Sequence, residues 1–105
     1  MDIPSNAGLK EISPWYNEKT IPRTLLVAGV APGGVWSKVV VESGMLEVVV
    51  NDGDATQTTS ASPVVVPPGA TLQVLPPVTS VRFHIHYFHP PRVNDGDNLA
   101  SMIAR

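Results

Sequence analysis

The chain has no cysteine and few charged residues. The absence of cysteine from its 105 residues excludes disulfide bonds, a thiol nucleophile and thiolate-ligated metal sites. Only 15% of the residues are charged, the net charge is -2, and the seven lysines and arginines are scattered. Nucleic acids and anionic membranes require clustered basic residues, so we expect neither as a partner. A surface with so little charge favours partial cover by another copy, that is, a homodimer.

Long hydrophobic runs and a targeting segment are also missing. Residues 1–6 have neither a basic start nor an apolar run, and no stretch approaches the roughly 18 apolar residues of a membrane helix. We therefore expect a cytoplasmic protein. A chain of 105 residues is long enough for one hydrophobic core and too short for two, which predicts a single domain over residues 1–105.

Proline and glycine are plentiful. Eleven prolines and eight glycines divide the chain into short valine-rich runs, and β-branched valine favours strands. Many short strands at this spacing are typical of a sandwich or small barrel, so the sequence predicts an all-β fold. The expected strands cover residues 24–30, 35–42, 45–51, 64–66, 71–75 and 81–88.

Turn residues predict how these strands connect. We expect strands 35–42 and 45–51 to form a hairpin across Ser43-Gly44, and strands 71–75 and 81–88 to pair across the proline-rich segment between them. The Asn-Asp-Gly-Asp run at 51–54 is a turn sequence. The polar residues 55–62 form an exposed connector, and residues 97–105 form a short C-terminal helix.

All three histidines lie within residues 84–89. Side chains alternate along a strand, so His84 and His86 share one face about 7 Å apart, and the apolar residues between them take the other. Two imidazoles on one face can hold a metal ion or transfer protons. This strand is therefore the strongest chemical signal in the sequence.

Several motifs resemble a known family. Ser-Pro-Trp-Tyr at 13–16, Pro-Gly-Gly-Val-Trp at 32–36, Pro-Pro-Gly at 67–69 and the histidine strand resemble the small cupins linked by name to tellurite resistance, which stand alone or precede a methyltransferase domain. The resemblance covers about residues 12–91 and leaves 92–105 as a tail. It implies a cupin-like double-stranded β-sandwich or barrel (jelly roll), often dimeric, whose lumen can hold a metal ion.

The usual cupin metal ligands are absent. A typical cupin has a histidine three residues after the glycine of its Pro-x-Gly turn, and here Leu72 occupies that position. Residues 34–44 contain no histidine but keep one carboxylate, Glu42. His84 and His86 supply at most half of a metal site, so a third ligand must come from Glu42, Glu47 or His89.

Three interpretations of the histidine face stay open. It is a solvated or dimer-covered sheet face, or a metal site formed by His84, His86 and Glu42, or a metal-free site in which Arg82, His84, His86 and Trp36 bind a small polar ligand. No serine has a local histidine partner and no nucleophile motif is present, so no catalytic residue is assigned.

The sequence favours a non-catalytic function. We expect a binding or sensing module for a small polar ligand or oxyanion, related to tellurite or stress by resemblance and with no cofactor. The alternative is a metal-dependent enzyme in which His84, His86 and a carboxylate such as Glu42 hold zinc, iron, manganese or nickel. The missing cupin histidines weigh against this enzyme.

Overall fold

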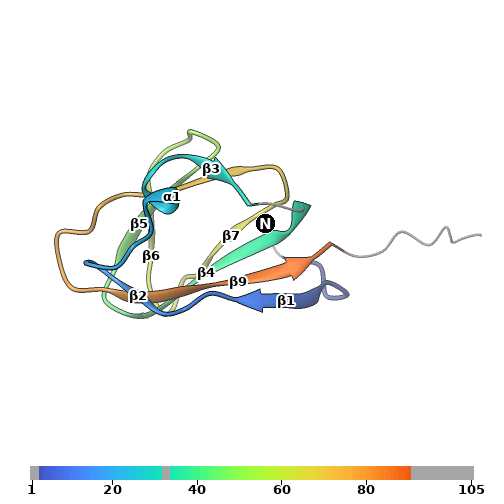
Figure 1. Cartoon of the computed structure of the whole chain (residues 1–105), viewed down its shortest axis with the longest axis horizontal. Helices are drawn as coiled ribbons and strands as arrows, with labels where there is room; N and C mark the ends of the chain where they lie inside the picture. The colour runs from blue at the N-terminus through green and yellow to red at the C-terminus, as the bar shows by residue number, and fades with distance from the viewer. Residues whose placement is uncertain (1–2, 32–33, 91–105) are drawn as a thin grey trace, which may run out of the picture.

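The structure is a sandwich of two antiparallel sheets (Figure 1). It is a computed structural model that describes residues 3–31 and 34–90. The first sheet has the order β1 (Gly8–Ile12), β9 (Arg82–His89), β4 (Trp36–Ser43), β7 (Val64–Val66), and β2 (Tyr16–Asn17) also pairs with β9. The second has the order β3 (Gly29–Val30), β8 (Thr71–Val74), β5 (Leu46–Val50), β6 (Thr56–Thr58). A four-residue helix, α1 (Arg23–Leu26), precedes β3. The predicted all-β sandwich is confirmed.

Alternating apolar residues of both sheets form the core. Every second side chain is buried from Ser37 to Val41 on β4 and from Phe83 to Ile85 on β9, and facing residues of β5 and β8 are buried in the same way. This alternation is what two sheets packed face to face require. Fully or nearly fully buried residues include Val39, Val41, Leu46, Val48, Val74, Phe83 and Ile85.

The two predicted hairpins are wrong, although their strand bounds are nearly right. β4 pairs with β9 and β7, whereas β5 pairs with β8 and β6, so the chain crosses from one sheet to the other at Gly44. Gly44 has a φ of 80°, and a Cβ there would collide with the backbone oxygen of Ser80. β8 and β9 likewise belong to different sheets. An alternating apolar pattern identifies a strand with a buried face, but it does not show which strand lies beside it.

Other differences concern the beginning and middle of the chain. The expected strand at 24–30 is helix α1 followed by the two-residue β3, and β1 and β2 were not predicted. The segment at 55–62 is not a simple exposed connector, because it contains β6 and the fully buried Thr58, whose hydroxyl donates to the carbonyl of Ser62 at 2.8 Å. The predicted C-terminal helix at 97–105 lies outside the described residues.

The predicted turn after β5 is confirmed. Asn51 and Asp52 have φ values of 54° and 56°, and the amide of Gly53 donates to the carbonyl of Val50 at 3.1 Å. Asparagine and aspartate tolerate this left-handed conformation better than most residues. In the described part of the chain, no helix has the length and apolar character needed to span a bilayer.

Candidate functional site

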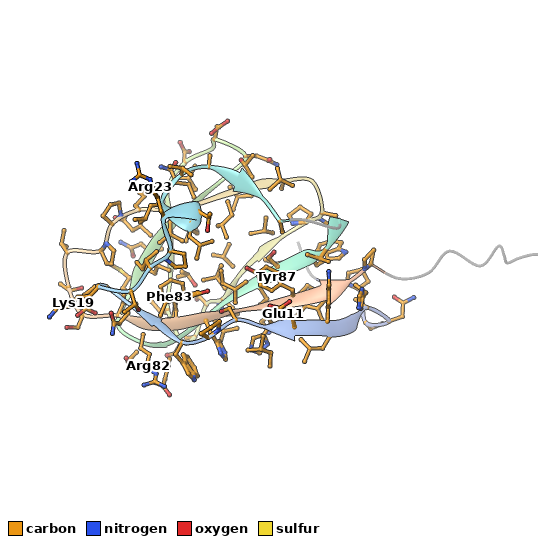
Figure 2. All side chains as sticks on the ribbon, viewed as in Figure 1. Glu11, Lys19, Arg23, Arg82, Phe83 and Tyr87 are labelled. Atoms are coloured by element: carbon orange, nitrogen blue, oxygen red, sulfur yellow. The ribbon has the colours of Figure 1, made fainter. Side chains whose placement is uncertain are left out.

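Strand β9 separates the candidate site residues between its two faces. Phe83 and Ile85 are fully buried between the sheets, and Tyr87 points the same way. Arg82 and the histidines take the opposite face, as alternation requires. Figure 2 shows Phe83 and Tyr87 on the side of β9 toward the second sheet and Arg82 on the other side. The histidine face is therefore the outside of the sandwich.

A stack of side chains occupies this outer face at the Arg82 end of β9. The indole ring of Trp15 lies parallel to the imidazole of His84, with 3.8 Å between centroids and 7° between planes. The guanidinium carbon of Arg82 lies 4.6 Å from the Trp15 ring, a cation–π distance. Arg82 Nε also lies 2.9 Å from Glu42 Oε1, in an exposed ion pair. Trp15 therefore fixes the position of His84 from one side.

His84 and His86 contact each other directly. Their Nε2 atoms are 2.9 Å apart, so one nitrogen donates a hydrogen and the other accepts it. Desolvation lowers the pKa of both imidazoles. The pKa of His84 is lowered further by His86 and Arg82 against an opposing effect of Glu42, and that of His86 by Lys38. These effects favour the neutral form of both imidazoles.

The prediction that Arg82, His84 and His86 share one face is confirmed, and this face is external. Glu42 lies on the same face, but its carboxylate is engaged by Arg82. Trp36 alternates with the buried Ser37 and lies opposite Phe88 in the register, which also places it on the outer face. Within residues 3–31 and 34–90, no three histidine, aspartate or glutamate side chains are grouped so as to hold a metal ion. The proposed third ligands therefore do not complete a site with the histidine pair in one chain.

The inner side of the first sheet borders a pocket of about 360 Å³ between the two sheets. Three of the residues that line it offer hydroxyl groups, namely Thr24 of α1, Ser37 of β4 and Tyr87 of β9. Burial raises the pKa of the Tyr87 phenol, with smaller contributions from Tyr16 and Glu11, so this hydroxyl stays protonated and can donate. None of the described lining residues is charged. The apolar lining includes Leu25, Val27, Val66, Ala70 and Leu72.

Leu72 of the pocket lining is a residue that distinguishes this chain from a typical cupin in the sequence resemblance. It stands at the position that the resemblance assigns to a metal-binding histidine, and it lines the pocket. At this position the pocket wall therefore carries an apolar side chain. Sequence reasoning missed Ser37 and Tyr87 as site residues. In the sequence, each of these residues is a polar residue in phase with the buried positions of its strand. Only the pairing of the strands shows that these positions face the pocket.

The Ser-Pro-Trp-Tyr motif serves both sides of β9. Ser13 lies between β1 and β2, and its hydroxyl accepts a hydrogen bond from the amide of Ile85 at 2.8 Å. The amide of Ser13 donates to the carbonyl of Ile85, also at 2.8 Å. Trp15 then turns outward to His84, whereas Tyr16 turns inward, 5.6 Å from Phe83 between ring centroids. The motif thus continues the edge of the sheet and fills both of its faces.

Comparison with known families identifies the domain. The family model of the TehB-like domain matches residues 11–85, which include the Ser13 motif, the described pocket-lining residues except Tyr87, and the first half of β9. The chain belongs to the TehB-like domain family. It is thus part of the tellurite-resistance-associated group that the sequence resembles.

A solved structure supports the fold of this TehB-like domain. The crystal structure of a protein from Escherichia coli strain K12 superposes with a TM-score of 0.77 at 19% sequence identity, covering 88% of this chain and 99% of that one. At this identity the similarity shows a shared fold. No curated protein sequence matches the chain.

Proposed function

We propose that this TehB-like domain is a non-catalytic binding module whose ligand occupies the pocket between the two sheets. The observation that carries the proposal is the lining itself. Leu72 stands where the cupin resemblance places a metal ligand, and the polar side chains among the described lining residues all carry hydroxyl groups. A cavity of this kind, apolar with a few directed polar groups, is the usual form of a small-molecule site. The crossing of the chain between sheets at Gly44 supports a cupin-like jelly roll as the scaffold.

The lining also indicates the ligand class. Ser37 and Tyr87 offer hydrogen bonds from one wall, and Leu25, Val27 and Leu72 offer apolar contact from the others. Arg82, the cation that sequence analysis assigned to oxyanion binding, lies on the outer face against Glu42 and Trp15. An oxyanion in the pocket would lose its hydration without gaining a charged partner, which is costly. We therefore expect a small, mainly apolar molecule with one or two hydroxyl or carbonyl groups.

The test uses cyclohexanol and phenol as probes of the pocket and tellurite as the competing oxyanion. Each is titrated into ¹⁵N-labelled protein while the amide resonances are followed by NMR. We expect the two alcohols to cause saturable shifts at Ser37, Ala70 and Leu72, and we expect no such shifts with tellurite.

A matched pair of variants locates the binding. Ala70 is buried at the pocket wall, whereas Ala61 is exposed. Ala70→Leu adds volume to the pocket and should abolish the shifts, whereas Ala61→Leu should leave them unchanged. Binding of tellurite at these residues, or alcohol binding that survives Ala70→Leu, would contradict the proposal.

A further inference from the structure

The hydrogen-bonded histidine pair on the outer face has no part in the proposed pocket. Tyr87 lies between His86 and Phe88 in sequence and points inward to the pocket, while His84 and His86 point outward. The sheet therefore separates the two sites, and an inference about the pair stands independently of the pocket ligand.

We propose that His84 and His86 form a two-nitrogen chelate for a divalent transition-metal ion, Cu²⁺ above all, on the outer face of β9. Their Nε2 atoms are 2.9 Å apart. Two imidazole nitrogens at about 2.0–2.1 Å from one metal ion are about 2.9 Å apart at a right angle, and about 3.3–3.4 Å apart at a tetrahedral angle. The observed separation matches the right angle, which is typical of tetragonal Cu²⁺ and Ni²⁺ sites.

The surroundings of the pair are compatible with such a chelate. Both imidazoles are partly exposed, and each can move its hydrogen to Nδ1 so that both Nε2 lone pairs face the ion. The parallel Trp15 ring holds His84 in place, which reduces the rotamer freedom lost on binding. Lys38, opposite His86 in the register, and Arg82, on the His84 side, oppose a cation, whereas Glu42 favours one from the His84 side. Water completes the coordination from the solvent side.

Trp15 provides a direct reporter of metal binding. Cu²⁺ at the pair would lie within a few ångströms of the indole ring, because that ring stacks on His84. The chain has two tryptophans, Trp15 and Trp36. The experiment uses untagged protein carrying Trp36→Phe, so that all tryptophan fluorescence comes from Trp15. We expect saturable quenching of Trp15 fluorescence by Cu²⁺, with weaker binding of Ni²⁺ and still weaker binding of Zn²⁺, the last because of its tetrahedral preference.

Single histidine substitutions identify the ligands. His84→Gln or His86→Gln should raise the half-saturating Cu²⁺ concentration by about 10–100-fold or more, since even outer-shell changes at metal sites have effects in that range. His89→Gln is the matched control, because His89 is exposed at the end of the same strand and lies outside the pair. It should leave the titration unchanged.

Electron paramagnetic resonance of the Cu²⁺ complex counts the nitrogen ligands. We expect two imidazole nitrogens in the parent protein and fewer in the His86→Gln variant, whose fold is checked by its thermal unfolding. Quenching that persists when both His84 and His86 are replaced, or that disappears in His89→Gln, would overturn the proposal. A parent spectrum without imidazole nitrogen would overturn it as well.

Discussion

The two faces of β9 carry different properties, although one run of alternating residues produces both. On the inner face, Phe83 and Ile85 are completely buried, and Tyr87 contributes one of the three hydroxyl groups in the mainly apolar lining of the pocket. On the outer face, His84 and His86 gather titratable nitrogen beside Trp15. The proposed ligand pocket and the proposed metal site thereby lie on opposite sides of one sheet. In a metal-binding cupin, by contrast, the resemblance implies that both would share the lumen.

The largest expected effect comes from replacing one residue on each face and comparing the changes in the free energy of unfolding. Phe83→Ala removes a fully buried ring and should reduce the free energy of unfolding by about 3–5 kcal/mol. His84→Ala removes a partly exposed ring that stacks on Trp15 and bonds to His86, and should cost about 1 kcal/mol. Urea-induced unfolding, followed by circular dichroism, measures both.

A loss of about 3–5 kcal/mol is a large share of the stability of a domain of this size, so the comparison also needs a milder inner-face variant. Phe83→Leu then provides the inner-face value, which should still exceed that of His84→Ala. Equal costs for Phe83→Leu and His84→Ala would show that the outer face contributes to stability as much as the core does.

The sequence predicts which residues of β9 share a face, but it does not predict which of the two faces is buried. Alternation alone placed His84 and His86 together and opposite Phe83, because the period of a strand is two residues. It could not tell which face meets the second sheet, since Phe88 and Trp36 are apolar residues on the outside. That choice is made by pairings distant in sequence, and these were predicted wrongly. The pocket depends on the same pairings and was therefore not predictable.

The middle test concerns the edge of β9 where the two faces meet. The hydroxyl of the buried Ser13 accepts a hydrogen bond from the Ile85 amide and donates one to the Pro14 carbonyl at 2.9 Å. Ser13→Ala leaves the Ile85 amide without this partner and should cost about 1–3 kcal/mol. Faster hydrogen exchange of the Ile85 amide should accompany the loss. Ser5→Ala, at an exposed position, is the control and should change neither the free energy of unfolding nor the exchange rate of the Ile85 amide. An unchanged exchange rate of the Ile85 amide in Ser13→Ala would refute the proposed role of the hydroxyl.

The smallest effect is the pH dependence of the outer face. The pKa of both His84 and His86 is lowered in the folded state from 6.5, so below about pH 6.5 the unfolded chain binds protons more readily than the folded one. The free energy of unfolding should therefore fall as the pH is lowered from 7.5 to 5.5, by less than the Ser13→Ala effect because the pair is partly exposed.

A variant with both His84 and His86 replaced by glutamine should lose this decline, whereas His89→Gln, which leaves the pair intact, should keep it. Lys38 and Arg82 add to this decline in stability, because their positive charges disfavour protonation of the neighbouring histidines. The contribution of Glu18 falls in a separate range, since hydrogen bonds from the backbone lower the pKa of its carboxyl below 4.5. A decline of equal size in the doubly substituted protein would mean that the neutral histidine pair adds nothing to the stability of the outer face. The contrast between the two faces of β9 would then rest on packing alone.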